Sequence, residues 1–147
     1  MPVDYHDAAK RLYDDAGFLF DEGCYVTAEH LYGLSGECSL KSALRNLDVS
    51  ESEVGLNGTF GKHLPEILSA VANAPRIDKR YGFLSDFAWE IGALKNWFPD
   101  FHMKRRYYHR DDVDGPAVTK LKASIERLRK ICDMALSRGS TRGRKQP

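Results

Sequence analysis

One fifteen-residue segment concentrates the side chains that are best suited to chemistry. Residues 96–110 contain four basic residues (lysine or arginine), two histidines and five aromatic residues. Cationic groups bind phosphates and aromatic rings stack on unpaired bases, so this composition is typical of a contact with single-stranded nucleic acid. The candidate RNA-binding residues are the basic side chains and tyrosines near the end of this segment, namely Lys104, Arg105, Arg106, Tyr107, Tyr108 and Arg110.

The same segment contains groups that suit metal-free cleavage of a phosphodiester. An imidazole moves a proton at the 2′-hydroxyl or at the leaving oxygen, while a guanidinium stabilises the charge of the transition state. In this interpretation His109 is the candidate catalytic acid or base, and Arg105 and Arg106 are the candidate catalytic cations.

A purely structural interpretation of the segment stays open at the level of sequence. The aromatic residues would then be core anchors, in particular Trp97, Phe98 and Tyr107. The arginines would pair with carboxylates that are close in the chain, namely Asp100, Asp111 and Asp112.

Other signatures of catalysis and metal binding are missing from the sequence. It has no glycine-rich phosphate loop, no Gly-x-Ser-x-Gly turn and no His-Glu-x-x-His pattern. The acidic run 111–114 fails as a calcium loop, because Arg110 then stands at the first ligand position. The histidines are scattered and the cysteines number only three, so we expect no metal, no cofactor and no disulfide scaffold.

The elements that position these side chains are predicted to be helices. Apolar residues recur at helical spacing in five stretches, which are 5–19, 28–47, 64–71, 84–98 and 118–135. No alternating run is long enough for a buried strand, and residues 48–61 are predicted to form a loop. The sequence therefore predicts an all-α protein, a five-helix antiparallel bundle.

Helix breakers and capping residues set the expected boundaries. Gly23 is expected to end the first helix, and Thr27 to be the N-cap of the second. The third helix is expected to end at 73–75. Gly115 is the expected cap of the last helix, which has Pro116 in its first turn.

The second helix carries two features that need a separate interpretation. Gly33 and Gly36 each cost about 1 kcal/mol of helix propensity, so we expect them to allow another helix to approach closely. Glu37 and Lys41 are four residues apart in the favourable order and are expected to form a surface pair. A place near a ligand or a dimer surface is the alternative for this pair.

Length and charge limit the class of protein. The 147 residues, 42% of them hydrophobic, suit one folded domain, and the sequence has no apolar run of membrane-spanning length. The N-terminus has no leader pattern, so we expect a cytoplasmic protein with no membrane partner. The last ten residues contain four bases and no acid, which predicts a helical domain at 1–137 and a basic, disordered tail at 138–147.

Two stretches resemble HEPN (higher eukaryotes and prokaryotes nucleotide-binding) domains. Residues 28–44 are similar to the second helix of that family, and Gly36-Glu37-Cys38-Ser39-Leu40-Lys41 carries the likeness. Asn96-Trp97-Phe98-Pro99-Asp100, followed by Arg106-Tyr107, is similar to the Trp-x-Pro-acid…Arg-Tyr element ahead of the family's last long helix. Together with the order of five helices, the likeness spans about residues 5–137.

The resemblance implies a HEPN-like helical bundle that forms a symmetric homodimer, often encoded beside a nucleotidyltransferase or in toxin–antitoxin and phage-defence loci. Catalytic members of the family are metal-independent endoribonucleases built on an Arg-x(4–6)-His motif. This chain departs from that motif, because its nearest approach is Arg105-x-x-x-His109. Lys104 has the right spacing to His109, but it lacks the two-pronged guanidinium.

The sequence supports three hypotheses about function. The first is a HEPN-like RNA- or nucleotide-binding dimerisation module, an accessory in a toxin–antitoxin or phage-defence type of system. The second is a metal-independent endoribonuclease with a variant Arg/His site. The third is a structural interaction partner that uses the loop 48–61 and the basic tail. The expected partners are a second copy of the chain, RNA or a nucleotide, and a protein such as a nucleotidyltransferase or an antitoxin.

Overall fold

The protein folds as a bundle of helices, as the sequence predicts. The structure, a computed structural model, describes residues 3–47, 49, 63–64, 66–77, 85–94 and 103–144. These ranges contain five α-helices and two short 3-10 helices and no strand. The helices are α1 (Tyr5–Asp21), α2 (Tyr25–Asn46), α3 (Glu66–Ile77), α4 (Ser85–Leu94), η4 (Met103–Tyr107), η5 (Arg110–Asp112) and α5 (Gly115–Arg144).

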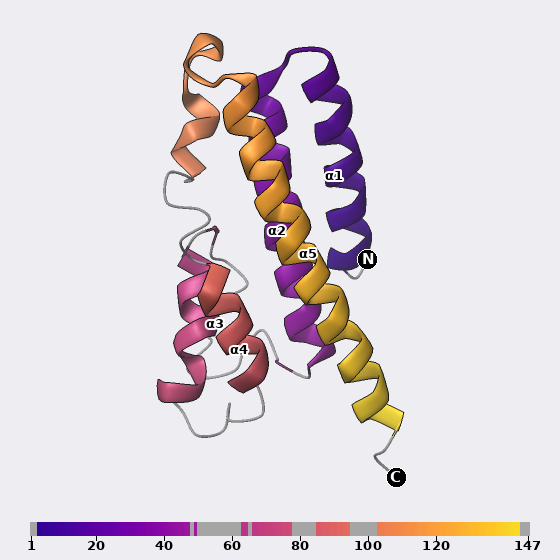
Figure 1. Cartoon of the computed structure of the whole chain (residues 1–147). Helices are drawn as coiled ribbons and strands as arrows, with labels where there is room; N and C mark the ends of the chain where they lie inside the picture. The colour runs from indigo at the N-terminus through magenta and orange to yellow at the C-terminus, as the bar shows by residue number, and fades with distance from the viewer. Residues whose placement is uncertain are drawn as a thin grey trace.

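The long helices α1, α2 and α5 lie side by side, and the shorter α3 and α4 pack together beside them (Figure 1). α1 runs antiparallel to α2 and α5, whereas α2 and α5 run in the same direction. The start of α5 at Gly115 accordingly lies against Tyr25 at the start of α2. The parallel pair is possible because the long connection between α2 and α5 contains α3, α4 and η4.

The turn between α1 and α2 is built around Gly23, which confirms that this residue ends the first helix. Gly23 has a φ of +78°, in the left-handed region that glycine adopts at little cost. Its N–H donates to the carbonyl of Phe20 at 3.0 Å, and the N–H of Cys24 donates to the carbonyl of Leu19 at 2.8 Å. These hydrogen bonds satisfy carbonyl groups at the end of α1 and hold the turn that reverses the direction of the chain into α2.

The predicted N-cap of α2 is wrong, because the helix begins at Tyr25 and Thr27 lies inside it. Cys24 stands at the cap position and forms no capping hydrogen bond through its side chain. The Tyr25 ring instead packs on Phe20 of α1, with 5.5 Å between the ring centroids. A tertiary contact thus fixes this helix start, and local capping rules do not detect such a contact.

Two further boundaries differ from the prediction. α3 continues past 73–75 to Ile77 with Pro75 inside it, so the proline does not end the helix at once. The residue that caps α5 is Asp114 and not Gly115, since Asp114 Oδ1 accepts a hydrogen bond from the N–H of Ala117 at 2.9 Å.

Some predictions concern residues outside the described ranges. The loop at 48–61 is one of them, except for Val49, which is buried. The end of the fourth helix and the motif at 96–100 also lie outside these ranges. α5 continues to Arg144, beyond the expected boundary at 137, and the division into a domain and a tail stays a prediction. No helix in the described ranges combines the length and the apolarity that crossing a membrane requires.

α2 is the central helix of the bundle, because α1, α5 and η4 all pack against it. Its buried side chains include Tyr32, Leu40 and Leu44, which join apolar residues from the other helices in one core. A Cβ atom at Gly36 would lie 2.5 Å from Ile125 Cδ1 and 3.2 Å from Leu128 Cδ2. The prediction of a close helix approach is therefore confirmed at Gly36.

This close approach predicts a clear effect of a larger side chain. We expect Gly36→Val to lower the free energy of unfolding by about 2 kcal/mol, because the added atoms displace Ile125 and Leu128 in a packed core. Gly17→Ala is the control, since the nearest atom to its new Cβ is Tyr32 Oη at 3.8 Å. We expect that variant to gain up to about 1 kcal/mol from helix propensity. Urea unfolding followed by circular dichroism measures both, and wild-type stability in Gly36→Val would contradict the packing.

Candidate nucleic-acid interface

A buried ion pair fixes η4 against α2. Arg105 Nε donates to Glu29 Oε1 at 2.5 Å, and Arg105 Nη2 donates to Glu29 Oε2 at 3.0 Å. The side chains of Glu29 and Arg105 are 5% and 19% exposed. A two-pronged pair fixes direction as well as distance, so the 3-10 turn has a defined orientation on the central helix.

The partner of Arg105 differs from both sequence-based interpretations. The structural interpretation expects acids near in the chain, at Asp100, Asp111 and Asp112, whereas the partner is Glu29, 76 residues earlier. The RNA-binding interpretation expects a guanidinium available to phosphate, whereas the guanidinium of Arg105 is held by a carboxylate. Arg105 therefore acts first as a positioning residue for its neighbours on η4.

The neighbours of Arg105 present an exposed cation and exposed rings. The guanidinium carbon of Arg106 lies 4.7 Å from the centroid of the Tyr107 ring, and Arg106 Nη2 donates to Tyr107 Oη at 2.9 Å. Tyr107 is 75% exposed, so the interpretation of this residue as a core anchor is wrong. The other exposed candidates around this turn are Lys104, Tyr108 and Arg110.

His109 holds a structural position at the start of η5. Its Nδ1 accepts a hydrogen bond from the N–H of Asp111 at 3.1 Å and lies 3.5 Å from Asp111 Oδ2. The side chain is 64% exposed. Because His109 caps η5 while Arg105 binds Glu29, these two candidate catalytic residues hold different partners.

A second polar cluster lies further along α2, and the sequence-based analysis did not identify it as one. Glu37 Oε2 accepts from Lys41 Nζ at 3.0 Å, and Glu37 Oε1 lies 2.8 Å from His63 Nδ1. The Glu37 and Lys41 side chains are only 6% and 7% exposed, so the expectation of a surface pair is wrong. The pair is buried because α2 is covered by its neighbours. No local signal points to His63, which is 26 residues from Glu37.

His30 connects this cluster with η4. Its pKa is lowered from 6.5, first by burial and then by the charge of Arg106. The charge of His63 lowers the pKa of His30 as well, and Glu37 opposes these effects. The pKa of His30 is thus lowered both by Arg106 of η4 and by His63. We call Glu29, His30, Glu37 and Lys41 the α2 polar row.

Neither the buried cysteines nor any group of metal-binding side chains in the described residues forms a reactive site. Burial raises the pKa of the Cys38 and Cys132 thiols, so neither is an activated nucleophile. Among the described residues, no group of three His, Cys, Asp or Glu side chains is arranged to hold a metal ion.

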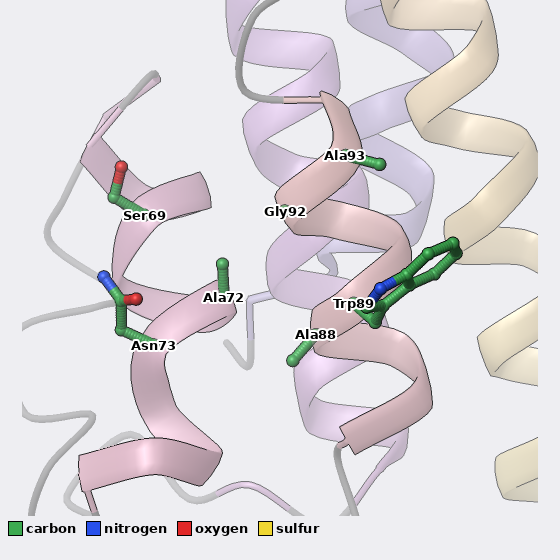
Figure 2. A pocket seen from close by; sticks show the side chains of 7 residues that line it. All are labelled: Ser69, Ala72, Asn73, Ala88, Trp89, Gly92 and Ala93. Carbon is green, nitrogen blue, oxygen red and sulfur yellow. The ribbon is translucent and has the colours of Figure 1, made fainter.

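A small pocket lies between α3 and α4, away from the polar row. Figure 2 shows Ala72 of α3 directed toward α4, while the Trp89 ring points away from α3, and Ser69 and Asn73 of α3 also line the pocket. The pocket has a volume of about 300 Å³, and none of its lining residues is charged. It has no charged or titratable side chain, so the candidate interface stays with η4 and α2.

Comparison of the chain with protein-family models, with curated proteins and with solved structures finds no match. The HEPN resemblance therefore rests on the sequence motifs and on the order of helices, and it stays a prediction.

The buried ion pair predicts that Arg105 matters more for stability than its exposed neighbours. We expect Arg105→Ala to lower the free energy of unfolding by about 3 kcal/mol, because the Glu29 carboxylate is left buried without its partner. Arg110→Ala is the matched control, since Arg110 is exposed on η5, and we expect a change within about 0.5 kcal/mol. Urea unfolding of both variants decides the matter, and equal stabilities would refute the role of the pair.

The lowered pKa of His30 predicts a dependence of stability on pH. The unfolded chain binds a proton at His30 near pH 6.5 and the folded chain resists it, so stability present above pH 6.5 is lost as the pH falls below that value. We expect His30→Gln to lose less stability than wild type over this range, because glutamine does not titrate. Thermal unfolding at pH values on both sides of 6.5 measures the difference, and parallel curves would count against it.

Proposed function

We propose that the chain is an RNA- or nucleotide-binding dimerisation module of the HEPN type, and that η4 is its nucleic-acid contact. The observation that carries the proposal is the stack of Arg106 on the exposed Tyr107 ring, on a turn that the Arg105–Glu29 pair fixes to α2. A base can continue such a stack, and the guanidinium can hold the adjoining phosphate. The orientation is set before any ligand binds, which reduces the entropic cost of binding.

The chemistry of η4 favours single-stranded RNA over a duplex. Exposed tyrosines at 107 and 108 need unpaired bases to stack on, and the cations at 104, 106 and 110 then follow the backbone. Arg105 is held by the Glu29 carboxylate. Among the described contacts, none of the cations at 104, 106 and 110 has an ion pair of this kind. We therefore infer a contact that depends on salt and is tolerant of sequence.

The proposal also covers the partners that the resemblance implies. Three large apolar side chains, Phe18, Trp89 and Met134, are between 49% and 76% exposed and offer surface to a second copy or to another protein. A homodimer, and a protein partner such as a nucleotidyltransferase or an antitoxin, are compatible with such surfaces. The accessory role in a toxin–antitoxin or phage-defence type of system rests on the HEPN resemblance.

The test of the proposed function is RNA binding by variants of η4. We expect Arg106→Ala and Tyr107→Ala each to weaken the binding of a fluorescein-labelled single-stranded RNA about tenfold, since one stack contributes about 1–3 kcal/mol. Lys10→Ala removes an exposed cation on α1 and should leave the affinity unchanged. Fluorescence anisotropy at several salt concentrations gives the dissociation constants. Wild-type affinity in both η4 variants, or no binding by the wild type, would refute the proposal.

A further inference from the structure

We propose that a groove between α4 and α5 is the docking site for an acidic amphipathic helix of a partner protein. The groove has a volume of about 450 Å³, and residues of these two helices line it. The inference rests on the proposed function only in that the module serves a partner protein, because the groove shares no residue with η4 or with the α2 polar row. RNA binding and helix docking are therefore tested separately.

The floor of the groove is apolar and belongs to the core of the bundle. Leu94 of α4 and Ile131 of α5 both line the groove, and they are only 3% and 6% exposed. On the side of α4 that faces α3, a Cβ atom at Gly92 would lie 3.3 Å from the Cβ of Ala72, so α3 supports α4 at close range. The groove is therefore formed before a partner arrives, which reduces the cost of binding.

Two large apolar side chains at the groove remain in contact with water. Trp89 is 76% exposed and Met134 is 49% exposed, and both line the groove. Figure 2 shows that the Trp89 ring points away from α3, so this ring is not used to pack the two short helices together. Tryptophan is enriched among the residues that dominate the energy of protein interfaces, and methionine adapts its shape to a bound helix. These two side chains are the anchors that we expect a partner to cover.

The charge at the groove favours an acidic partner. Arg127 and Lys130 line the groove and are exposed, and neither takes part in an ion pair among the described contacts. Glu90 is the one acidic residue among the lining residues, so two positive charges stand against one negative charge. Carboxylates on a partner compensate this excess, whereas lysines and arginines add to it. Two cations beside an apolar floor suit a protein surface better than a phosphate backbone, which needs many more.

The spacing of the lining residues suits a helical partner. On α5 they stand at positions 127, 130, 131 and 134, which share one face and span about two turns. On α4 they stand at 89, 90, 93 and 94, which repeat after four residues. Two packed helices leave a groove beside their line of contact, and the apolar stripe of a third helix fits into it. The matching stripe has apolar residues at i, i+3, i+4 and i+7, with acidic residues beside them.

Binding of two matched synthetic peptides tests the inference. The first is a fluorescein-labelled helical peptide with leucines at i, i+3, i+4 and i+7 and glutamates beside them, and the second has lysines in place of the glutamates. We expect the wild type to bind the glutamate peptide about tenfold more tightly than the lysine peptide, because the charge at the groove is positive. Trp89→Ala should weaken the binding of the glutamate peptide about tenfold, as the loss of a tryptophan anchor does. Fluorescence anisotropy gives the dissociation constants.

Reversal of the charge at the groove provides a stricter readout. The double variant Arg127→Glu and Lys130→Glu should lose about tenfold in affinity for the glutamate peptide and should gain affinity for the lysine peptide. Lys120→Glu is the matched control, since Lys120 is exposed on α5 and does not line the groove. Phe18→Ala removes an exposed aromatic side chain from α1 and is the control for Trp89→Ala. Both controls should keep the wild-type affinity for the glutamate peptide.

Other outcomes would overturn the inference. These are a wild type that does not bind the glutamate peptide, one that binds both peptides equally, and a Trp89→Ala variant that keeps the wild-type affinity. A dimer that sedimentation equilibrium detects in the wild type and not in Trp89→Ala would instead make the groove a contact between copies of the chain. Binding to phosphatidylglycerol vesicles that Trp89→Ala abolishes would assign the groove to a membrane surface.

The same variants separate this inference from the proposed function. We expect Arg106→Ala to lose RNA affinity and to keep its affinity for the glutamate peptide, and Trp89→Ala to show the reverse. A wild type that binds the peptide but no RNA would overturn the proposed function and leave the groove as a docking site. A wild type that binds RNA but not the peptide would overturn the docking site alone.

Discussion

The contact between Arg105 and Glu29 sets the geometry on which the polar side of the molecule depends. η4 is a single short turn, and a turn of this length has little intrinsic stability of its own. Two parallel hydrogen bonds to a carboxylate on the central helix give it a fixed place. Arg106 and Tyr107 follow directly in the chain. The buried pair therefore positions both the exposed Arg106–Tyr107 stack and the Arg106 charge that acts on His30.

α2 combines two demands that usually fall on different helices. It forms the centre of the apolar core, yet it also buries the charged side chains of Glu29, Glu37 and Lys41. Burial of a charge is costly unless a partner compensates it, and each of these three groups has one. This arrangement requires a residue without a side chain at Gly36, because only then can Ile125 and Leu128 of α5 cover the helix.

The sequence predicts the helices well because apolar periodicity and turn residues are local signals. The role of Gly23 and the close approach at Gly36 both follow from what glycine permits locally. The errors share a different cause. The start of α2 depends on Tyr25 packing against α1, and the burial of Glu37 depends on which elements cover α2, so neither is encoded within a few residues. The partners of Arg105 and His63 lie 76 and 26 residues away, beyond the reach of any spacing rule.

The same distance explains why the motif search considers His109 and not the contact of His63 with Glu37. A spacing rule finds groups on one helix turn, and it therefore selects His109, whose imidazole caps η5 through Asp111. A partner that orients an imidazole can come from anywhere in the fold. Glu37 supplies that constraint to His63 from the interior of α2, with Lys41 balancing the second oxygen. Because the carboxylate is already held by the core, the imidazole is oriented by contacts that also stabilise the bundle, and its orientation does not depend on a bound ligand.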